Sequence, residues 1–197
     1  MREALMTRSR SKAGFTMSEV VVVLAIVATM LGAIIPNLMT AIQNYRLSAS
    51  ARDVASQIQN ARYRSLRNNA VCSFMLLPSG GQFGVDLSGD GNISTGTTDV
   101  ILPLNSNVSF ADLNTPPASL TSVTTLSTGS KSGIGFTPRG TLANINSTTG
   151  LPDFATALPA NGFVMYLSNT RNKYMAITVS PAGRVRTWSS SNGSTWR

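Results

Sequence analysis

An apolar run near the N-terminus, from Val20 to Pro36, constrains this chain more than any other feature, because one threonine and one glycine are its only interruptions. A helix over residues 15–38 would extend about 36 Å at 1.5 Å per residue, which is enough to cross a bilayer. Glu19 stands at the entrance of the run. A carboxylate deep in a membrane costs roughly 2.5–3.5 kcal/mol, and less near the interface. The sequence therefore predicts a membrane-spanning helix whose acidic residue needs a partner charge.

The residues before the run predict how the chain enters the membrane. Four bases precede it, and none follows until Arg46, so the N-terminus is expected to stay cytoplasmic while the remainder is exported; they are Arg2, Arg8, Arg10 and Lys12. A secretory signal peptide has its cleavage site after the apolar core, whereas Gly14 precedes it here. An ordinary anchor would not need the Gly-Phe-Thr-x-x-Glu entrance. We therefore favour an anchor helix that is cut after Gly14.

The segment Gly14-Phe15-Thr16-Met17-Ser18-Glu19, with the apolar run and Pro36, resembles the class III signal of type IV pilins and type II secretion pseudopilins. The resemblance implies that a prepilin peptidase cleaves after Gly14 and methylates the new N-terminus, Phe15. In a packed fibre, Glu19 could neutralise the α-amine of another subunit, because an unpaired carboxylate is costly in an apolar interior; the alternative is a carboxylate that snorkels to the membrane surface. Pro36 removes a backbone hydrogen bond, so a bend or local melting of the helix is expected there.

A second helical pattern covers residues 39–69. Apolar residues recur there every three to five positions, which predicts an amphipathic helix that packs on a sheet; they are Leu47, Ala51, Val54, Ile58, Ala61 and Leu66. Asn68 and Asn69 are expected to end it. The arginines of this segment are expected to form a solvated or fibre-contacting face; they are Arg46, Arg52, Arg62, Arg64 and Arg67.

Residues 70–197 are rich in Gly, Ser, Thr and Asn and contain short apolar runs between turn residues, which predicts a β-rich head. The expected strands are Val71–Leu77, Gln82–Asp86, Val100–Leu104, Val108–Ala111, Gly133–Thr137, Gly162–Ser168, Tyr174–Ser180 and Arg184–Trp188. Hairpin turns are expected at residues 169–172 and 181–183, and a long surface excursion at residues 114–132. The predicted fold class is α+β: a cytoplasmic leader at 1–14, a transmembrane segment at 15–38, an amphipathic helix at 39–69, and a head of antiparallel sheets at 70–197.

Two segments of the head resemble the H-type pseudopilins and the FimT/FimU-like minor pilins. They are Gly133–Gly140, with its Phe-x-Pro-x-Gly pattern, and Ile177–Arg186, with its Gly-Arg-x-Arg pattern. The resemblance implies a structural subunit that primes or caps a type IV pilus or a type II secretion pseudopilus. It also implies an inner-membrane location with a periplasmic head, and a place in the fibre after assembly. The implied partners are the prepilin peptidase, other minor pilins or pseudopilins, the inner-membrane assembly platform and membrane lipid.

The Gly-Arg-x-Arg pattern suggests a second role. Alternation along a strand places Arg184 and Arg186 on one face, about 7 Å apart, which matches successive phosphates of a nucleic-acid strand. By resemblance to DNA-binding FimT-like minor pilins, these two arginines would contact DNA during natural transformation. Further bases and two aromatic residues could enlarge the patch and stack on bases; they are Arg171, Lys173, Arg197, Trp188 and Trp196. An arginine pair on an edge strand also commonly prevents edge-to-edge aggregation or contacts a neighbouring subunit.

A polar loop after the second predicted strand resembles the first half of an EF-hand calcium loop. Asp86, Ser88, Asp90 and Asn92 offer oxygen ligands at alternate positions, with a glycine where the chain must turn. A hairpin turn would explain the same residues. Calcium at this loop is the one cofactor that the sequence suggests.

Composition argues against catalysis. The chain has no histidine, so His-based triads and His-ligated metal sites are excluded, and no Walker-type phosphate loop is present. Its net charge of +8 is that of a modestly basic exported protein, which is compatible with anionic partners. Cys72 is the only cysteine, so no internal disulfide can form, and it is expected to be a small buried core residue. The sequence predicts a substrate of a peptidase rather than an enzyme.

Overall fold

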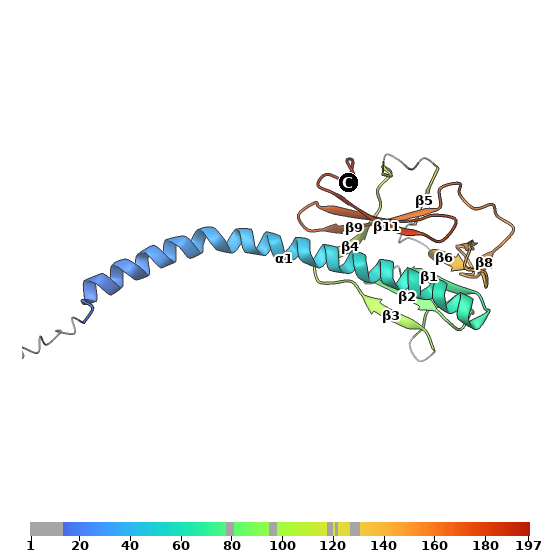
Figure 1. Cartoon of the computed structure of the whole chain (residues 1–197), viewed down its shortest axis with the longest axis horizontal. Helices are drawn as coiled ribbons and strands as arrows, with labels where there is room; N and C mark the ends of the chain where they lie inside the picture. Colours follow the sequence, from blue (N-terminus) through green and yellow to red (C-terminus); the bar gives the residue numbers. More distant parts are fainter. Residues whose placement is uncertain (1–13, 78–80, 95–97, 118–119, 121, 127–130) are drawn as a thin grey trace, which may run out of the picture. The chain divides into compact units, whose positions relative to one another are not determined.

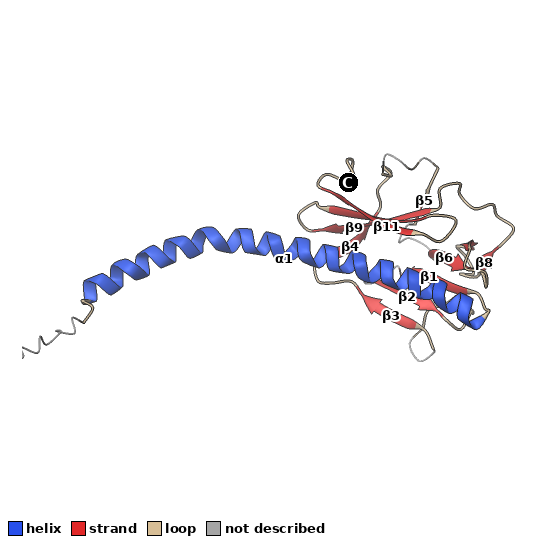
Figure 2. Ribbon diagram, viewed as in Figure 1, coloured by secondary structure: helices blue, strands red, loops and turns tan. Residues whose placement is uncertain are grey.

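The computed structural model describes residues 14–77, 81–94, 98–117, 120, 122–126 and 131–197. The chain divides into two compact units, Met1–Met39 and Thr40–Arg197. The described residues form one helix, α1 (Met17–Asn68), which contributes to both units, and eleven strands, all in the second unit (Figures 1 and 2). The second unit is called the head below. The predicted α+β class is confirmed.

Local hydrogen bonds explain where α1 begins and ends. Thr16 accepts the backbone N–H of Glu19 on its Oγ1 at 3.3 Å and on its carbonyl oxygen at 3.1 Å, so it caps the first turn. At the other end, Asn69 adopts a left-handed conformation (φ 48°), and the N–H of Ala70 donates to the Ser65 carbonyl oxygen at 3.3 Å. A left-handed residue just past the helix is a common helix stop. The expected end at Asn68 and Asn69 is thereby confirmed.

The part of α1 in the first unit is apolar and unpacked. All of its described side chains from Met17 to Met39 are exposed, and by length and composition the helix could cross a membrane. The helix is continuous through Pro36, so the structure does not show the local melting that was one of the two effects expected there. The predicted leader lies outside the described residues, apart from Gly14.

Two sheets make up the β-structure of the head (Figure 2). The first, called sheet A here, has the order β3-β2-β1-β6-β7-β8. The second, sheet B, has the order β11-β10-β9-β4, and β5 pairs parallel with β9. All the other pairings are antiparallel. The strands are β1 (Cys72–Leu77), β2 (Gln82–Asp86), β3 (Val100–Pro103), β4 (Val108–Ala111), β5 (Thr124–Thr125), β6 (Ser132–Phe136), β7 (Leu142–Ile145), β8 (Pro152–Asp153), β9 (Phe163–Asn169), β10 (Tyr174–Val179) and β11 (Val185–Ser190).

One hydrophobic core joins the head part of α1 to both sheets. The stripe predicted on the helix is buried as far as Ala61, but Leu66 is 47% exposed, so the stripe ends one turn earlier than expected. The sheets contribute alternate residues from their inner faces, as half-buried strands do. The main contributors are Val54 and Ile58 from α1, Phe74, Phe83 and Ile134 from sheet A, and Met165, Leu167 and Ile177 from sheet B.

The expected surface excursion at residues 114–132 is partly wrong. Residues 118–119, 121 and 127–130 lie outside the described residues, but the chain between them returns to sheet B as β5. Leu126 is buried, and its N–H donates to the Val164 carbonyl oxygen at 2.9 Å. Part of this stretch therefore extends sheet B beside β9 and places Leu126 in the main core. On the outer face of sheet B, Val164, Tyr166 and Ala176 form a second apolar cluster.

Candidate functional site

The N-terminal residues that the resemblance singles out are accessible. Phe15 is 82% exposed, and among the described residues no atom beyond the chain neighbours comes within 4 Å of the Cβ position built on Gly14. Glu19 is exposed in the first turn of α1, where a carboxylate is also favoured by the helix dipole. The peptide bond after Gly14 can therefore be reached by a peptidase.

The start of β11 carries the predicted pair of arginines. Arg184 precedes the strand and Arg186 lies within it, and both are exposed. Val185 between them packs against the main core. Arg184, Arg186 and Trp188 line one cavity of about 250 Å³ on the outer face of sheet B.

The other predicted bases do not join this pair. Residue pairing in β10 and β11 sets Thr178 opposite Arg186 but Tyr174 opposite Ser190. Lys173 thus lies five residues along from Thr178, roughly 17 Å away at about 3.4 Å per residue. Arg171 lies in the β9–β10 turn at that same far end. Arg197 lines a different cavity, of about 370 Å³, together with Lys173, Asn44 and Ser48.

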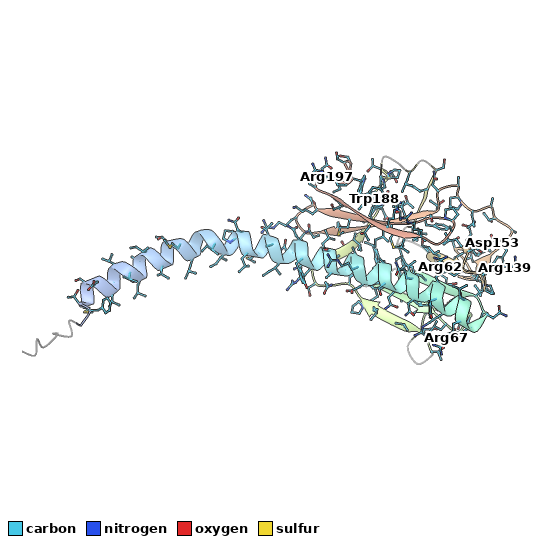
Figure 3. All side chains as sticks on the ribbon, viewed as in Figure 1. Arg62, Arg67, Arg139, Asp153, Trp188 and Arg197 are labelled. Atoms are coloured by element: carbon cyan, nitrogen blue, oxygen red, sulfur yellow. The ribbon has the colours of Figure 1, made fainter. Side chains whose placement is uncertain are left out.

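The two tryptophans are held by the fold rather than free for stacking on bases. The Trp188 indole N–H donates to Thr178 Oγ1 at 3.1 Å, and that of Trp196 donates to the Thr115 carbonyl oxygen at 3.0 Å. The Trp196 ring lies 5.5 Å from the Tyr166 ring, between centroids. Both indoles pack against the outer cluster of sheet B. Trp188 is labelled in Figure 3, as is Arg197.

Arg62 was expected on a solvated or fibre-contacting face, but its guanidinium binds two turns of the head. Its Nε donates to the Gly140 carbonyl oxygen at 3.0 Å, and its Nη1 donates to the Gly183 carbonyl oxygen at 3.2 Å (Figure 3). Gly140 and Gly183 have φ values of 72° and 77°, in the left-handed region that favours glycine. The Phe-x-Pro-x-Gly and Gly-Arg-x-Arg patterns therefore meet at one guanidinium, which ties both turns to α1. No pattern in the sequence distinguishes Arg62 from its neighbouring arginines.

The loop with the calcium-like spacing uses its oxygens within the chain. The buried Asp86 carboxylate accepts the N–H groups of Gly89 and Gly91 at 2.7 and 3.0 Å and the Ser88 hydroxyl at 3.0 Å. The Lys131 ammonium lies 2.6 Å from Asn92 Oδ1 and also donates to two nearby carbonyl oxygens. Within the described residues, no group of three His, Cys, Asp or Glu side chains could hold a metal ion. Calcium binding at this loop stays a prediction.

Cys72 is buried in β1, as expected. Burial raises the pKa of its thiol, the Asp86 carboxylate raises it further, and the Arg64 guanidinium opposes these effects. A thiol with a raised pKa is less often ionised, and the thiolate is the reactive form of cysteine. Cys72 therefore belongs to the core rather than to a reactive site.

Comparison with known protein families identifies the N-terminal segment. The family model described as the prokaryotic N-terminal methylation motif matches residues 9–35. The N-terminal segment of this chain carries that motif. The match spans Gly14, Phe15 and Glu19, the residues on which the resemblance was based. Pilin-type proteins are processed by prepilin peptidase, assemble with other pilins and act as structural subunits. Together, the motif and the apolar part of α1 suggest that this chain is anchored in a membrane.

Comparison with solved structures gave a match to the crystal structure of the type IV minor pilin FimU from Pseudomonas aeruginosa strain PAO1. The two chains share 12% sequence identity, the match covers 73% of this chain and 88% of FimU, and its TM-score is 0.44. Comparison with curated proteins gave no significant match.

Proposed function

We propose that this chain is a minor pilin or pseudopilin that helps to prime or cap a type IV pilus or a type II secretion pseudopilus. The observation that carries the proposal is the prepilin motif at the entrance of an apolar, fully exposed helix segment. An exposed apolar surface is unfavourable in water. It would be stable in a bilayer before assembly and in the packed interior of a fibre after assembly. In this proposal, the N-terminus is cytoplasmic and the head is periplasmic until the subunit is extracted into the fibre.

The N-terminus of the mature chain tests this proposal directly. We expect mass spectrometry of protein from the native host to show N-methylated Phe15 as the first residue, because the motif directs cleavage after Gly14. In a host that lacks prepilin peptidase, the same chain should keep residues 1–14. An intact leader in the native host, or a mature chain that begins elsewhere, would contradict the proposal.

Arg184 and Arg186 favour a second candidate function, the binding of duplex DNA by the assembled subunit. Both side chains are exposed and line the cavity on the outer face of sheet B, and none of the described residues that line this cavity is acidic. The geometry supports contact with two phosphates of one strand. The patch is smaller than the sequence suggested, because Lys173 and Arg197 lie at the other end of β11.

Replacing both arginines with glutamine tests DNA binding. We expect the detergent-solubilised double variant to lose retention of duplex DNA at low salt while its tryptophan fluorescence stays native, because two phosphate contacts are removed from the surface. A matched control replaces Arg171 and Lys173, which lie at the far end of β10, with glutamine and should retain DNA. Equal retention by both double variants would exclude Arg184 and Arg186 as the DNA contacts.

A further inference from the structure

The backbone of β11 has an open edge at its start. In an antiparallel pair, successive residues direct their backbone groups alternately toward the partner strand and away from it. The Ser180 N–H donates to the Arg184 carbonyl oxygen at 3.0 Å, so the backbone groups of Arg184 point toward β10. The residue pairing places the backbone groups of Arg186 in the same direction. Val185 and Thr187 therefore direct their N–H and C=O groups outward. In the described part of the chain, no strand lies beyond β11 on that side.

The far half of the same edge is already covered. Ser189 is the next outward-facing residue, and it exchanges two backbone hydrogen bonds with Arg197, at 2.9 and 3.0 Å. The C-terminal residue thus pairs with β11 as an added strand would. The open stretch is confined to Val185 and Thr187, which offer two donors and two acceptors in register.

Two cavities flank this open stretch, one on each face of the sheet. On the inner side, a cavity of about 380 Å³ is lined by Tyr63 and Leu66 of α1, which are 69% and 47% exposed, and also by Arg62 and Val185. On the outer side lies the cavity of about 250 Å³ with Arg186 and Trp188. Arg184 lines both. Because side chains of a strand alternate between faces, a strand added at this edge would direct alternate residues toward Tyr63 and Leu66 on the inner side and toward Arg186 on the outer side.

We propose that this edge binds an extended segment of another protein in which apolar and acidic residues alternate, added as a further strand of sheet B. Backbone pairing to Val185 and Thr187 would supply the affinity, and the two cavities would supply the selectivity, as in β-strand addition generally. None of the described residues that line the two cavities is acidic, so the charges favour an acidic partner. The same arginines would repel basic strands, which prevents unselective pairing at an exposed edge.

The proposal concerns the head alone and does not depend on processing or on the pilin role. Its probe is a capped eight-residue peptide with alternating glutamate and valine, added to the detergent-solubilised full chain. We expect the peptide to slow hydrogen exchange at the outward amides of Val185 and Thr187. Unchanged exchange of both amides at saturating peptide would overturn the proposal.

A proline at position 187 separates backbone pairing from charge. Thr187→Pro removes an outward N–H that makes no bond to β10, so an edge strand can accept it. We expect it to bind the peptide about tenfold more weakly than the matched Thr187→Ala variant, which keeps the N–H. Both variants should retain duplex DNA, since the arginines are unchanged. Equal peptide affinity of the two variants would overturn the proposal. A wild-type chain that binds DNA but not the peptide would also overturn it.

The probe can be altered instead, which keeps the test valid if the proline variant does not fold. A peptide with N-methyl groups on alternate residues has the same charges but cannot complete the backbone pairing. We expect the wild-type chain to bind only the unmethylated peptide. Equal binding of both peptides would show a purely electrostatic contact and would overturn strand addition.

Discussion

Replacing Glu19 with valine is expected to leave the chain cleaved and inserted in the membrane but absent from isolated fibres or fibre-priming complexes. The substitution extends the apolar run and leaves Gly14 and Phe15 unchanged. In a fibre, the positive α-amine of a neighbouring subunit would then lie in an apolar interior without its carboxylate. Removing one partner of a buried ion pair costs about 3–5 kcal/mol, which corresponds to at least ~100-fold in assembly. Immunoblots of sheared fibres and of membranes, compared side by side, would measure the effect.

Glu19→Gln is the matched control for this experiment, because it keeps the size and polarity of the side chain and removes only its charge. If the charge is what matters, the glutamine variant should fail to assemble as the valine variant does. Normal incorporation of either variant would contradict the pairing of Glu19 with an amine. It would favour the alternatives, a carboxylate that stabilises the first turn of α1 through the helix dipole or one that snorkels to the membrane surface.

Replacing Arg62 with methionine is expected to destabilise the head by about 2 kcal/mol. The variant keeps most of the apolar stem but leaves the carbonyl oxygens of Gly140 and Gly183 without their donors. Hydrogen bonds from charged groups contribute roughly 1.5–3 kcal/mol each, and we take less here because the side chain is half-buried and water can replace part of the loss. For a head of this size, the expected fall in melting temperature is roughly 4–8 °C.

Arg64→Met provides the control for Arg62. Arg64 lies on the same helix and is also half-buried, but its Nε donates only to Asn60 Oδ1, one turn earlier on the same helix, at 3.2 Å. We expect the urea midpoint for unfolding of the Arg64→Met variant, measured by tryptophan fluorescence, to stay close to that of the wild type. Equal midpoints for the two methionine variants would show that the guanidinium of Arg62 does not hold the two turns to α1.

Periodicity predicted the secondary structure well where an element is long or strongly alternating. The helix predicted over residues 15–69 is found at Met17–Asn68, and all eight predicted strands are present. The three strands that were missed are short: β5 and β8 have two residues each and β7 has four. Strands of this length exist only because a neighbouring strand is in place to pair with them. The parallel pairing of β5 with β9, for example, leaves no pattern within residues 124–125 themselves.

For the site residues too, the sequence predicts what depends on neighbouring positions and not what depends on strand pairing. The alternation of Arg184, Val185 and Arg186 is local, so the sequence could predict it. Which other side chains share their surface depends on the pairing of β10 with β11, and that pairing separates Lys173 from the arginine pair. Arg62 could not be singled out, because its two acceptors lie 78 and 121 residues further along the chain.

The position of the core on α1 has a consequence for how the head can fold. Leu47, Val54 and Ile58 complete the interior of the head, yet they belong to the same helix as the apolar stretch that precedes Thr40. Strands without these residues would have no apolar surface of α1 on which to pack. A fragment that starts at residue 70 would therefore expose the inner faces of both sheets to water.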